Sequence, residues 1–271
     1  MPAPTVRLTP EQIAFFQREG YLSLPALTTR EEIDVLRGIY DRLFERRAGR
    51  EEGNQFDLAG TDEEGKEAAL PQILAPRKYA PELNDTLLRA NAAVIAAQLG
   101  GPECIFRGDH AINKPPRSGA ATPWHQDEAY WGDASVYDAA FSIWVPFQEA
   151  TVENGCMQFI PGSQRFEVFT HHSIGHDPRV HGLEIDPGQT DLSRAVACPL
   201  PAGGCTIHGT RVLHYTGPNL SAQPRRAYIM IFHTPEKKLA TPRNFYWNHQ
   251  KHTAREERAR QARAAAAPAT T

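Results

Sequence analysis

The spacing of apolar residues changes near residue 103, and this change constrains the fold more than any other feature of the sequence. Before it, apolar residues recur at helical spacing, whereas after it they fall in short runs between turn residues. The runs that predict strands cover residues 104–107, 140–147, 157–160, 204–208 and 227–232. We therefore predict a mainly β fold with flanking α-helices, whose core is a double-stranded β-helix, the jelly roll of cupin-like proteins.

Three helices are predicted in the N-terminal part, residues 9–100. The first begins at a capping box over residues 9–12 and ends at Gly20. A second capping box, over residues 29–32, precedes apolar residues at helical spacing. The third helix is predicted over residues 82–99, before a glycine pair.

A chain of 271 residues with 41% apolar residues suits one large folded domain and excludes wholesale disorder. We predict a single domain over residues 1–248, with a jelly-roll core at 103–235. The remaining residues, 249–271, are charged and then alanine-rich. They predict a surface helix that frays and takes no part in the chemistry.

Charge and composition narrow the possible partners. The net charge of -3 is spread along the chain, without the basic stripe of a nucleic-acid-binding protein or the basic cluster of a protein that binds an anionic membrane.

No apolar run is long enough to span a bilayer, and the first residues lack the pattern of a signal peptide, so a cytoplasmic location is the default expectation. The four cysteines show no C-x-x-C spacing, which argues against a zinc ribbon or a disulfide framework. A homo-oligomer stays possible.

The sharpest local signal is an H-x-D sequence, His125 to Asp127. Residues two apart in a strand point to the same side, so the imidazole and the carboxylate could meet at one point. Two histidines and one carboxylate on one face of a metal are typical of non-haem iron(II) oxygenases. An H-x-D sequence alone is weak evidence, because a strand histidine bonded to a neighbour gives the same pattern.

A second segment, residues 214–226, strengthens the signal. His214 is followed by a turn and then by two arginines that open a new strand. Arg225 shares a face with residues 227, 229 and 231, whereas Arg226 shares the opposite face with residues 228, 230 and 232. One arginine can thus point into the core, where its planar fork could hold a carboxylate.

These segments resemble the phytanoyl-CoA dioxygenase family of 2-oxoglutarate-dependent oxygenases. The similarity rests on residues 123–127, 150–163 and 214–226, in the family's order, and together with the N-terminal pattern it covers most of residues 10–235. The resemblance implies that His125, Asp127 and His214 bind Fe(II).

The resemblance also implies residues for the cosubstrate. Arg225 matches the family's 2-oxoglutarate arginine, Thr216 stands where a serine is usual, and Trp144 matches a tryptophan that walls the pocket. Gln72 and His110 lie where further cosubstrate contacts occur in the family. Gln164 departs from the family, in which a histidine often ends the Pro-Gly-Ser segment. Because Asp127 is kept, the resemblance favours hydroxylation over halogenation.

Other candidate residues have plainer expected roles. His208 is expected to be packed or exposed rather than a ligand, and Lys114 to be a solvated loop lysine. Tyr130 and Trp131 could line the substrate pocket or belong to the core. Four further histidines lie in the segment between residues 164 and 196, which predicts a lid or an insertion rather than a metal site: His171, His172, His176 and His181.

The function implied by the resemblance is an Fe(II)- and 2-oxoglutarate-dependent dioxygenase that uses O2 and hydroxylates a small-molecule substrate, a natural product or an acyl or CoA-type compound, with release of succinate and CO2. Desaturation, epoxidation or cyclisation at the same centre are alternatives. A non-catalytic metal-binding jelly roll and a zinc hydrolase are rival classes. A hydrolase would have no need for Arg225 and Thr216.

Overall fold

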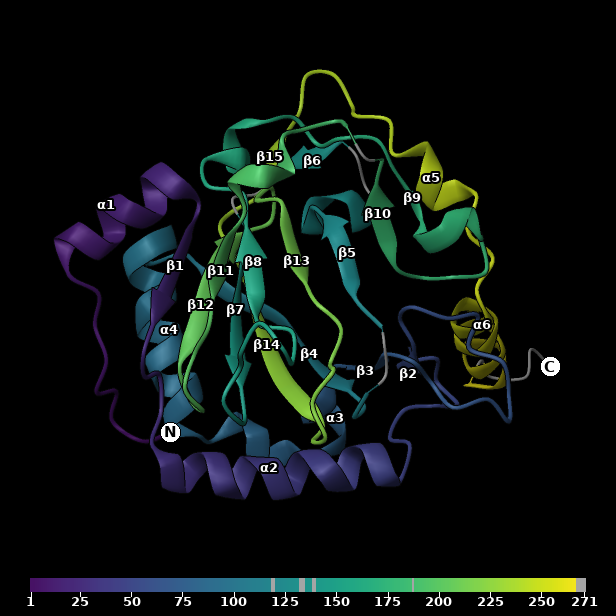
Figure 1. The fold of residues 1–271 in the computed structure, drawn as a ribbon, viewed down its shortest axis with the longest axis horizontal. Helices are drawn as coiled ribbons and strands as arrows, with labels where there is room; N and C mark the ends of the chain where they lie inside the picture. Colours follow the sequence, from purple (N-terminus) through teal and green to yellow (C-terminus); the bar gives the residue numbers. More distant parts are fainter. Residues whose placement is uncertain (118–119, 132–134, 138–139, 187, 267–271) are drawn as a thin grey trace.

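The structure is a computed structural model that describes residues 1–117, 120–131, 135–137, 140–186 and 188–266. The last five residues of the predicted tail, 267–271, lie outside this part. The expected mainly β fold with flanking helices is confirmed (Figure 1). Among the described helices, none combines the length and apolar composition that a membrane crossing requires.

The helices lie mainly at the two ends of the chain and the strands in between. The helices are α1 (Pro10–Glu19), α2 (Arg30–Glu45), α3 (Pro76–Tyr79), α4 (Leu87–Gly100), α5 (Tyr246–His249) and α6 (Ala254–Ala266). The strands are β1 (Tyr21–Leu24), β2 (Gln55–Asp57), β3 (Pro71–Leu74), β4 (Ile105–Lys114), β5 (Thr122–His125), β6 (Val136–Tyr137), β7 (Phe141–Pro146), β8 (Met157–Phe159), β9 (His171–Ser173), β10 (Leu183–Ile185), β11 (Val196–Cys198), β12 (Cys205–Gly209), β13 (His214–Thr216), β14 (Arg225–His233) and β15 (Lys237–Lys238).

Two antiparallel sheets form the centre of the fold. The larger sheet has the strand order β1-β12-β7-β14-β4-β3-β2, and the smaller has the order β11-β8-β13-β5. Trp144 and Ile229 from the larger sheet and Met157 and Phe159 from the smaller belong to one buried cluster. The sheets therefore face each other across a shared apolar core.

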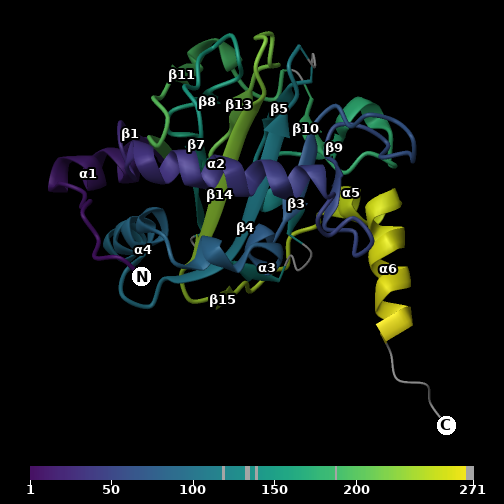
Figure 2. The ribbon, with the colours of Figure 1, turned by 90° about the horizontal axis from the view of Figure 1, so that it is seen from below.

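The outer face of the larger sheet is covered by α2 and α4 (Figure 2). The buried side of α2, including Leu36 and Tyr40, packs with Tyr228 and Met230 of β14. Side chains of β14 alternate between two faces, as the sequence predicts. One face packs against the helices, and the other belongs to the core between the two sheets. On the helix side, Arg226 donates to both carboxylate oxygens of Asp41, over 2.5 and 2.9 Å.

The capping predictions are confirmed at α1 and only half confirmed at α2. The complete capping box forms around Thr9, and Gly20 ends α1 with a φ of 81°. At α2, Thr29 caps the helix, but the side chain of Glu32 does not return to it. The carboxylate accepts instead from the backbone N–H groups of Leu87 and Leu88, over 2.7 and 2.9 Å. The first N–H groups of α4 thus compete for this carboxylate, and α2 is tied to α4. The third helix begins later than predicted, at Leu87.

The prediction that Lys114 is a solvated loop lysine is wrong. It ends β4 with no exposed surface, and its ammonium donates to the carbonyls of Ala120, Thr216 and Gly217. Burial, and then the charge of Arg225, hold its pKa well below the usual value. The carbonyls of Thr216 and Gly217, where the turn after β13 begins, converge on this ammonium. The sequence around Lys114 could not reveal these contacts, because the two carbonyls lie in a distant segment of the chain.

Asn219 fixes the same turn from the other side. Its buried amide donates to the carbonyls of Lys114, Pro115 and Gln223, and its oxygen accepts from the backbone N–H of Ser221. The turn joins β13 to β14, so Asn219 determines how Thr216 and Arg225 lie relative to each other.

Replacing Asn219 with alanine removes the donor to the buried carbonyl of Lys114 and to the carbonyls of Pro115 and Gln223. We expect the free energy of unfolding to fall by about 2–4 kcal/mol, measured by urea denaturation. Asn84→Ala, at an exposed position, is the matched control and should change stability by less than about 0.5 kcal/mol. Equal effects of the two substitutions would contradict the role of Asn219.

Candidate active site

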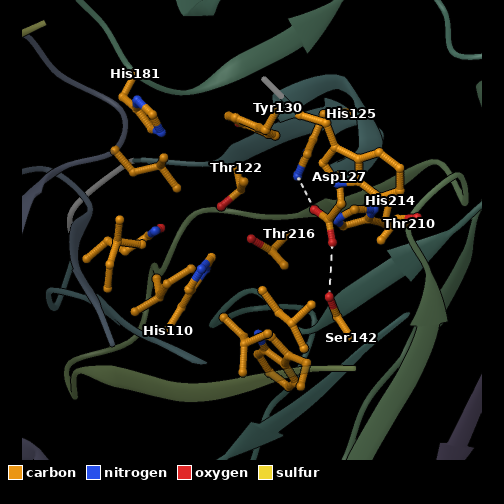
Figure 3. A pocket seen from close by; sticks show the side chains of 18 of the residues that line it. His110, Thr122, His125, Asp127, Tyr130, Ser142, His181, Thr210, His214 and Thr216 are labelled. Carbon is orange, nitrogen blue, oxygen red and sulfur yellow. Dashed lines mark hydrogen bonds and ion pairs between the residues drawn. The ribbon is translucent and has the colours of Figure 1, made fainter. Parts of the chain in front are cut away.

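A cavity of about 620 Å³ lies between the two sheets. Its walls include residues of β3, β4, β5, β7, β8, β12, β13 and β14, and the segment 248–256 contributes further lining residues. Figure 3 shows that a group of histidine and carboxylate side chains occupies one end, while His110 and His181 lie on the opposite side. All eight predicted site residues line this one cavity: Gln72, His110, His125, Asp127, Trp144, His214, Thr216 and Arg225.

The structure brings the three predicted metal ligands together. His125 ends β5, Asp127 begins the following 3-10 turn, and His214 begins β13. Because β13 pairs with β5 in the register His214 opposite His125, the two imidazoles are neighbours. One ligand atom from each of the three residues lies within 4.8 Å of the others, so the group could hold one metal ion.

Each imidazole is oriented by the backbone two residues earlier. Nδ1 of His125 lies 2.7 Å from the carbonyl of Pro123, and Nδ1 of His214 lies 2.8 Å from the carbonyl of Val212. A carbonyl can only accept, so each Nδ1 carries a proton, which leaves Nε2 as the ring atom that can bind a metal. Outer contacts of this kind fix the tautomer of metal-binding histidines.

The carboxylate of Asp127 lies between the two imidazoles and a second group of donors. Its Oδ1 is 3.5 Å from Nε2 of His125 and 3.3 Å from Nε2 of His214. Its Oδ2 accepts from the hydroxyl of Ser142 over 3.1 Å. Burial by itself would raise the pKa of Asp127, but His214 and the hydrogen bonds from the surrounding histidines hold this pKa well below the usual value.

His208 lies closer to this centre than predicted. It is buried on β12, and its Nε2 lies 3.6 Å from Oδ2 of Asp127. Of the two expectations, packed or exposed, the structure shows the first, and its exclusion from the metal ligands stays a prediction. It also lies beside the carboxylate that would bind the metal. The contact with Ser142 was also missed, because both residues lie on strands far from Asp127 in sequence and no local motif marks them.

Arg225 lines the same cavity as the three predicted metal ligands and forms the end of the predicted cosubstrate pocket. Its side chain is 1% exposed, its guanidinium lies 5.3 Å from the centre of the Trp144 ring, and burial lowers its pKa to about 10. Nε and Nη1 of Arg225 and Oγ1 of Thr216 are buried and without hydrogen-bond partners. Buried donors without partners are costly, and a bound carboxylate would satisfy them. The distal carboxylate of 2-oxoglutarate fits this requirement.

Gln72 and His110 extend the same wall. Gln72 is buried on β3, and His110 faces Ile229 of β14 in the strand register. Burial lowers the pKa of His110 to about 4, so its ring is neutral at physiological pH. Both can offer a polar side chain to a ligand without adding charge.

The histidines of the segment 164–196 have different surroundings. His171 is buried outside the cavity and accepts from the backbone N–H of Gln126, whereas His181 lines the cavity. His172, His176 and Asp186 bring ligand atoms within 4.8 Å of one another, but two of the three are exposed. Exposed clusters of this kind are common without an ion, so this group stays outside the site.

Two aromatic candidates line the cavity, whereas Gln164 lies elsewhere. Tyr130 and Trp131 are lining residues, and the Tyr130 hydroxyl accepts from the backbone N–H of Leu183 over 2.7 Å. The amide of Gln164 donates to the carbonyls of Gln17 and Arg18 at the end of α1. Gln164, which departs from the family pattern, therefore anchors the end of α1.

The C-terminal segment contributes to the cavity, which the sequence did not indicate. His249, Lys251, Arg255 and Glu256 are lining residues, although this tail was predicted to be a surface helix without a role in the chemistry. The helix itself is confirmed as α6. No motif could have revealed its docking, because only the folded chain brings it beside β2 (Figure 1).

Comparisons with known proteins agree with this geometry. The family described as Phytanoyl-CoA dioxygenase (PhyH) matches residues 16–227. Two crystal structures of EvdO2 from Micromonospora carbonacea var. aurantiaca each align with 91% of this chain and 99% of that chain. The structure complexed with 2-oxoglutarate is 38% identical with a TM-score of 0.76, and the other is 42% identical with a TM-score of 0.78.

Curated relatives are more distant but nearly as extensive. A Dictyostelium discoideum protein named phytanoyl-CoA dioxygenase domain-containing protein 1 homolog is 25% identical, covering 84% of this chain and 92% of that protein. An ectoine dioxygenase of Bordetella bronchiseptica is also 25% identical, covering 87% of this chain and 79% of that protein. The predicted family, enzyme class and cofactors are thus confirmed: the chain belongs to the phytanoyl-CoA dioxygenase family, the non-haem oxygenases that depend on Fe(II) and 2-oxoglutarate.

Proposed function

We propose that this chain hydroxylates a small organic substrate, with Fe(II) held by His125, Asp127 and His214 and 2-oxoglutarate anchored by Arg225. The observation that carries the proposal is a pair of features in one cavity: three convergent ligand atoms and, beyond them, buried guanidinium and hydroxyl donors without partners. The two facing sheets that enclose them support the further proposal of a jelly-roll core within one domain.

The residues have separate tasks in this proposal. Nε2 of each histidine is free to bind the metal because the backbone occupies each Nδ1. Ser142 holds the second oxygen of Asp127, which leaves the first oxygen to the metal. Arg225 and Thr216 hold the distal carboxylate of the cosubstrate, and Trp144 closes the pocket behind it.

Fe(II), 2-oxoglutarate and O2 supply the oxidising chemistry, in which the cosubstrate is converted to succinate and CO2 while one oxygen atom enters the substrate. The chain supplies position and the exclusion of water. Apolar residues such as Leu74, Met157 and Ile231 line the cavity beside the polar groups. A substrate carbon can therefore be held near the metal in an environment with little water.

Desaturation, epoxidation or cyclisation would use the same residues and stay as alternatives to hydroxylation. A zinc hydrolase is disfavoured, because it would leave the buried donors of Arg225 and Thr216 without a purpose. A metal-binding jelly roll without catalysis is disfavoured for the same reason.

The direct test is an anaerobic titration of the metal-free protein with Fe(II) and then 2-oxoglutarate, followed by visible absorption. A weak charge-transfer band that needs both additions would support the proposal, and succinate release would then serve to screen substrates. Tight zinc binding without such a band would favour the hydrolase.

The first prediction from this assignment concerns the metal. His214→Ala removes one of three ligands, and we expect iron binding to weaken at least about tenfold and the charge-transfer band to disappear. His172→Ala, in the exposed cluster, is the matched control and should leave iron stoichiometry and the band unchanged. Loss of the band in the control alone would place the iron site at the surface cluster.

The second prediction concerns the cosubstrate. Arg225→Gln removes the charge that would meet the distal carboxylate, and we expect the KM for 2-oxoglutarate to rise roughly 30- to 100-fold with iron still bound. The control is Arg226→Gln, because the adjacent side chain faces α2 and pairs with Asp41. An unchanged KM in the Arg225 variant, measured by succinate formation, would remove this residue from the cosubstrate site.

A further inference from the structure

The C-terminal segment is fixed in place at the cavity by several hydrogen bonds. The indole of Trp247 and the amide of Asn248 both donate to the carbonyl of Ala129, over 3.0 and 2.8 Å. The ammonium of Lys251 donates to the carbonyl of His181 over 3.0 Å. These contacts hold the residues that follow α5 against the cavity wall rather than in solvent.

This segment brings two cations to the cavity. Lys251 Nζ lies 4.9 Å from the centre of the Tyr130 ring, and the Arg255 guanidinium lies 5.0 Å from the centre of the Phe56 ring. The rings of Tyr130 and His125 are perpendicular, with their centres 5.9 Å apart. Tyr130 is therefore a neighbour of both the ammonium and the first predicted metal ligand.

Neither cation has a carboxylate partner among the residues that the structure describes. Nε of Arg255 is buried without a hydrogen-bond partner. Arg258, less than one turn further along α6, forms an ion pair with Asp62 instead. Glu256 also lines the cavity, but its carboxylate accepts from the backbone N–H of Thr253 and caps the start of α6.

The charges of the cavity do not balance without an additional anion. At the catalytic end, Fe(II) and Arg225 are matched by Asp127 and the two carboxylates of 2-oxoglutarate. At the C-terminal end, Glu256 is the one acidic residue among the described lining residues that opposes Lys251 and Arg255. His181 adds no charge, because burial and then the two cations hold its pKa well below the usual value. This end therefore has an excess positive charge in partly buried surroundings, where it attracts anions strongly.

We infer that Lys251 and Arg255 form a subsite for an anionic group, a carboxylate or a phosphate, of the primary substrate. The inference rests on the proposed function, since it requires a substrate in the cavity. The substrate would direct its anion to the C-terminal segment and its reacting carbon past Tyr130 toward the metal ligands. Leu58 and Trp131 also line the cavity and suit an apolar part between the two.

The pKa of Lys251 agrees with this reading and provides a way to test it. Burial lowers the pKa of this amine to about 8, so part of it is neutral and nucleophilic near neutral pH. Pyridoxal 5′-phosphate carries an aldehyde and a phosphate, whereas pyridoxal lacks the phosphate. The aldehyde condenses with a lysine amine to an imine with loss of water, and borohydride reduces the imine to a stable secondary amine.

In the experiment, the full chain carries zinc in place of iron and is saturated with 2-oxoglutarate. It is treated with one of the two probes, and the labelled lysines are then mapped by peptide mass spectrometry. Labelling is normalised to the exposed Lys237 in the same sample, which corrects for the different reactivity of the two aldehydes. We expect the phosphate to accelerate labelling of Lys251 at least about tenfold, since charge-assisted contacts are strong. Inorganic phosphate or acetate should protect Lys251 at constant ionic strength, and the better protector identifies the anion.

Arg255→Gln should reduce the advantage of the phosphate probe to about twofold or less without slowing pyridoxal. Arg260→Gln is the matched control, because this exposed arginine lies on the same helix and pairs with Glu257. Circular dichroism establishes that both variants keep their fold, and Arg255→Lys should restore part of the advantage. If a variant does not fold, the comparison of the two probes on the wild-type chain still decides the question.

Three results would overturn the inference: equal labelling by both probes, an unchanged ratio in Arg255→Gln, or labelling of Lys251 that occurs in a sample without 2-oxoglutarate and is abolished when 2-oxoglutarate is added. The last result would mean that the cosubstrate itself occupies these cations. Labelling needs neither iron nor turnover, so its outcome is read separately from succinate formation. An enzyme that forms succinate but fails the labelling test would keep the proposed function and lose the anion subsite.

Discussion

The site depends on one constraint, the alternation of side chains along β14. Successive residues of a strand must face opposite sides, so Arg225 and Arg226 cannot both enter the core. Arg226 is held outside by Asp41 of α2, which leaves Arg225 inside beside Trp144. A slip of one residue in this strand would exchange the two arginines and leave the cavity without its deep cation. The packing of α2 on the sheet therefore secures the chemistry of the opposite face.

A second constraint ties the metal ligands to the backbone. The pairing of β13 with β5 sets the two histidines side by side, and a carbonyl two residues before each one fixes its ring. Lys114 and Asn219 then hold the turn that leads from His214 to Arg225. The ends of the proposed cosubstrate site are thus positioned by hydrogen bonds that join the turn after β13 to the end of β4. Such preorganisation reduces the cost of ordering the site when ligands bind.

The sequence revealed those parts of the site that follow from local rules. The H-x-D sequence correctly indicated that His125 and Asp127 meet, although Asp127 lies in a 3-10 turn after the strand and not in the strand itself. The alternation in β14 correctly separated Arg225 from Arg226. Contacts between distant segments could not be derived in this way. The burial of Lys114, the approach of His208 and Ser142 to Asp127, and the redirection of Glu32 toward α4 all depend on which segments the fold brings together.

The two ends of the cavity are built differently, and this difference bears on specificity. The catalytic end is formed by paired strands, whose register leaves little freedom to its side chains. The other end is formed by the turn after α5 and the start of α6, which follow the last strand of the core. Substitutions in such a terminal segment can alter charge and shape without disturbing strand pairing. Recognition of the primary substrate can therefore change while the iron and 2-oxoglutarate end stays constant, as a family of enzymes with one chemistry and several substrates requires.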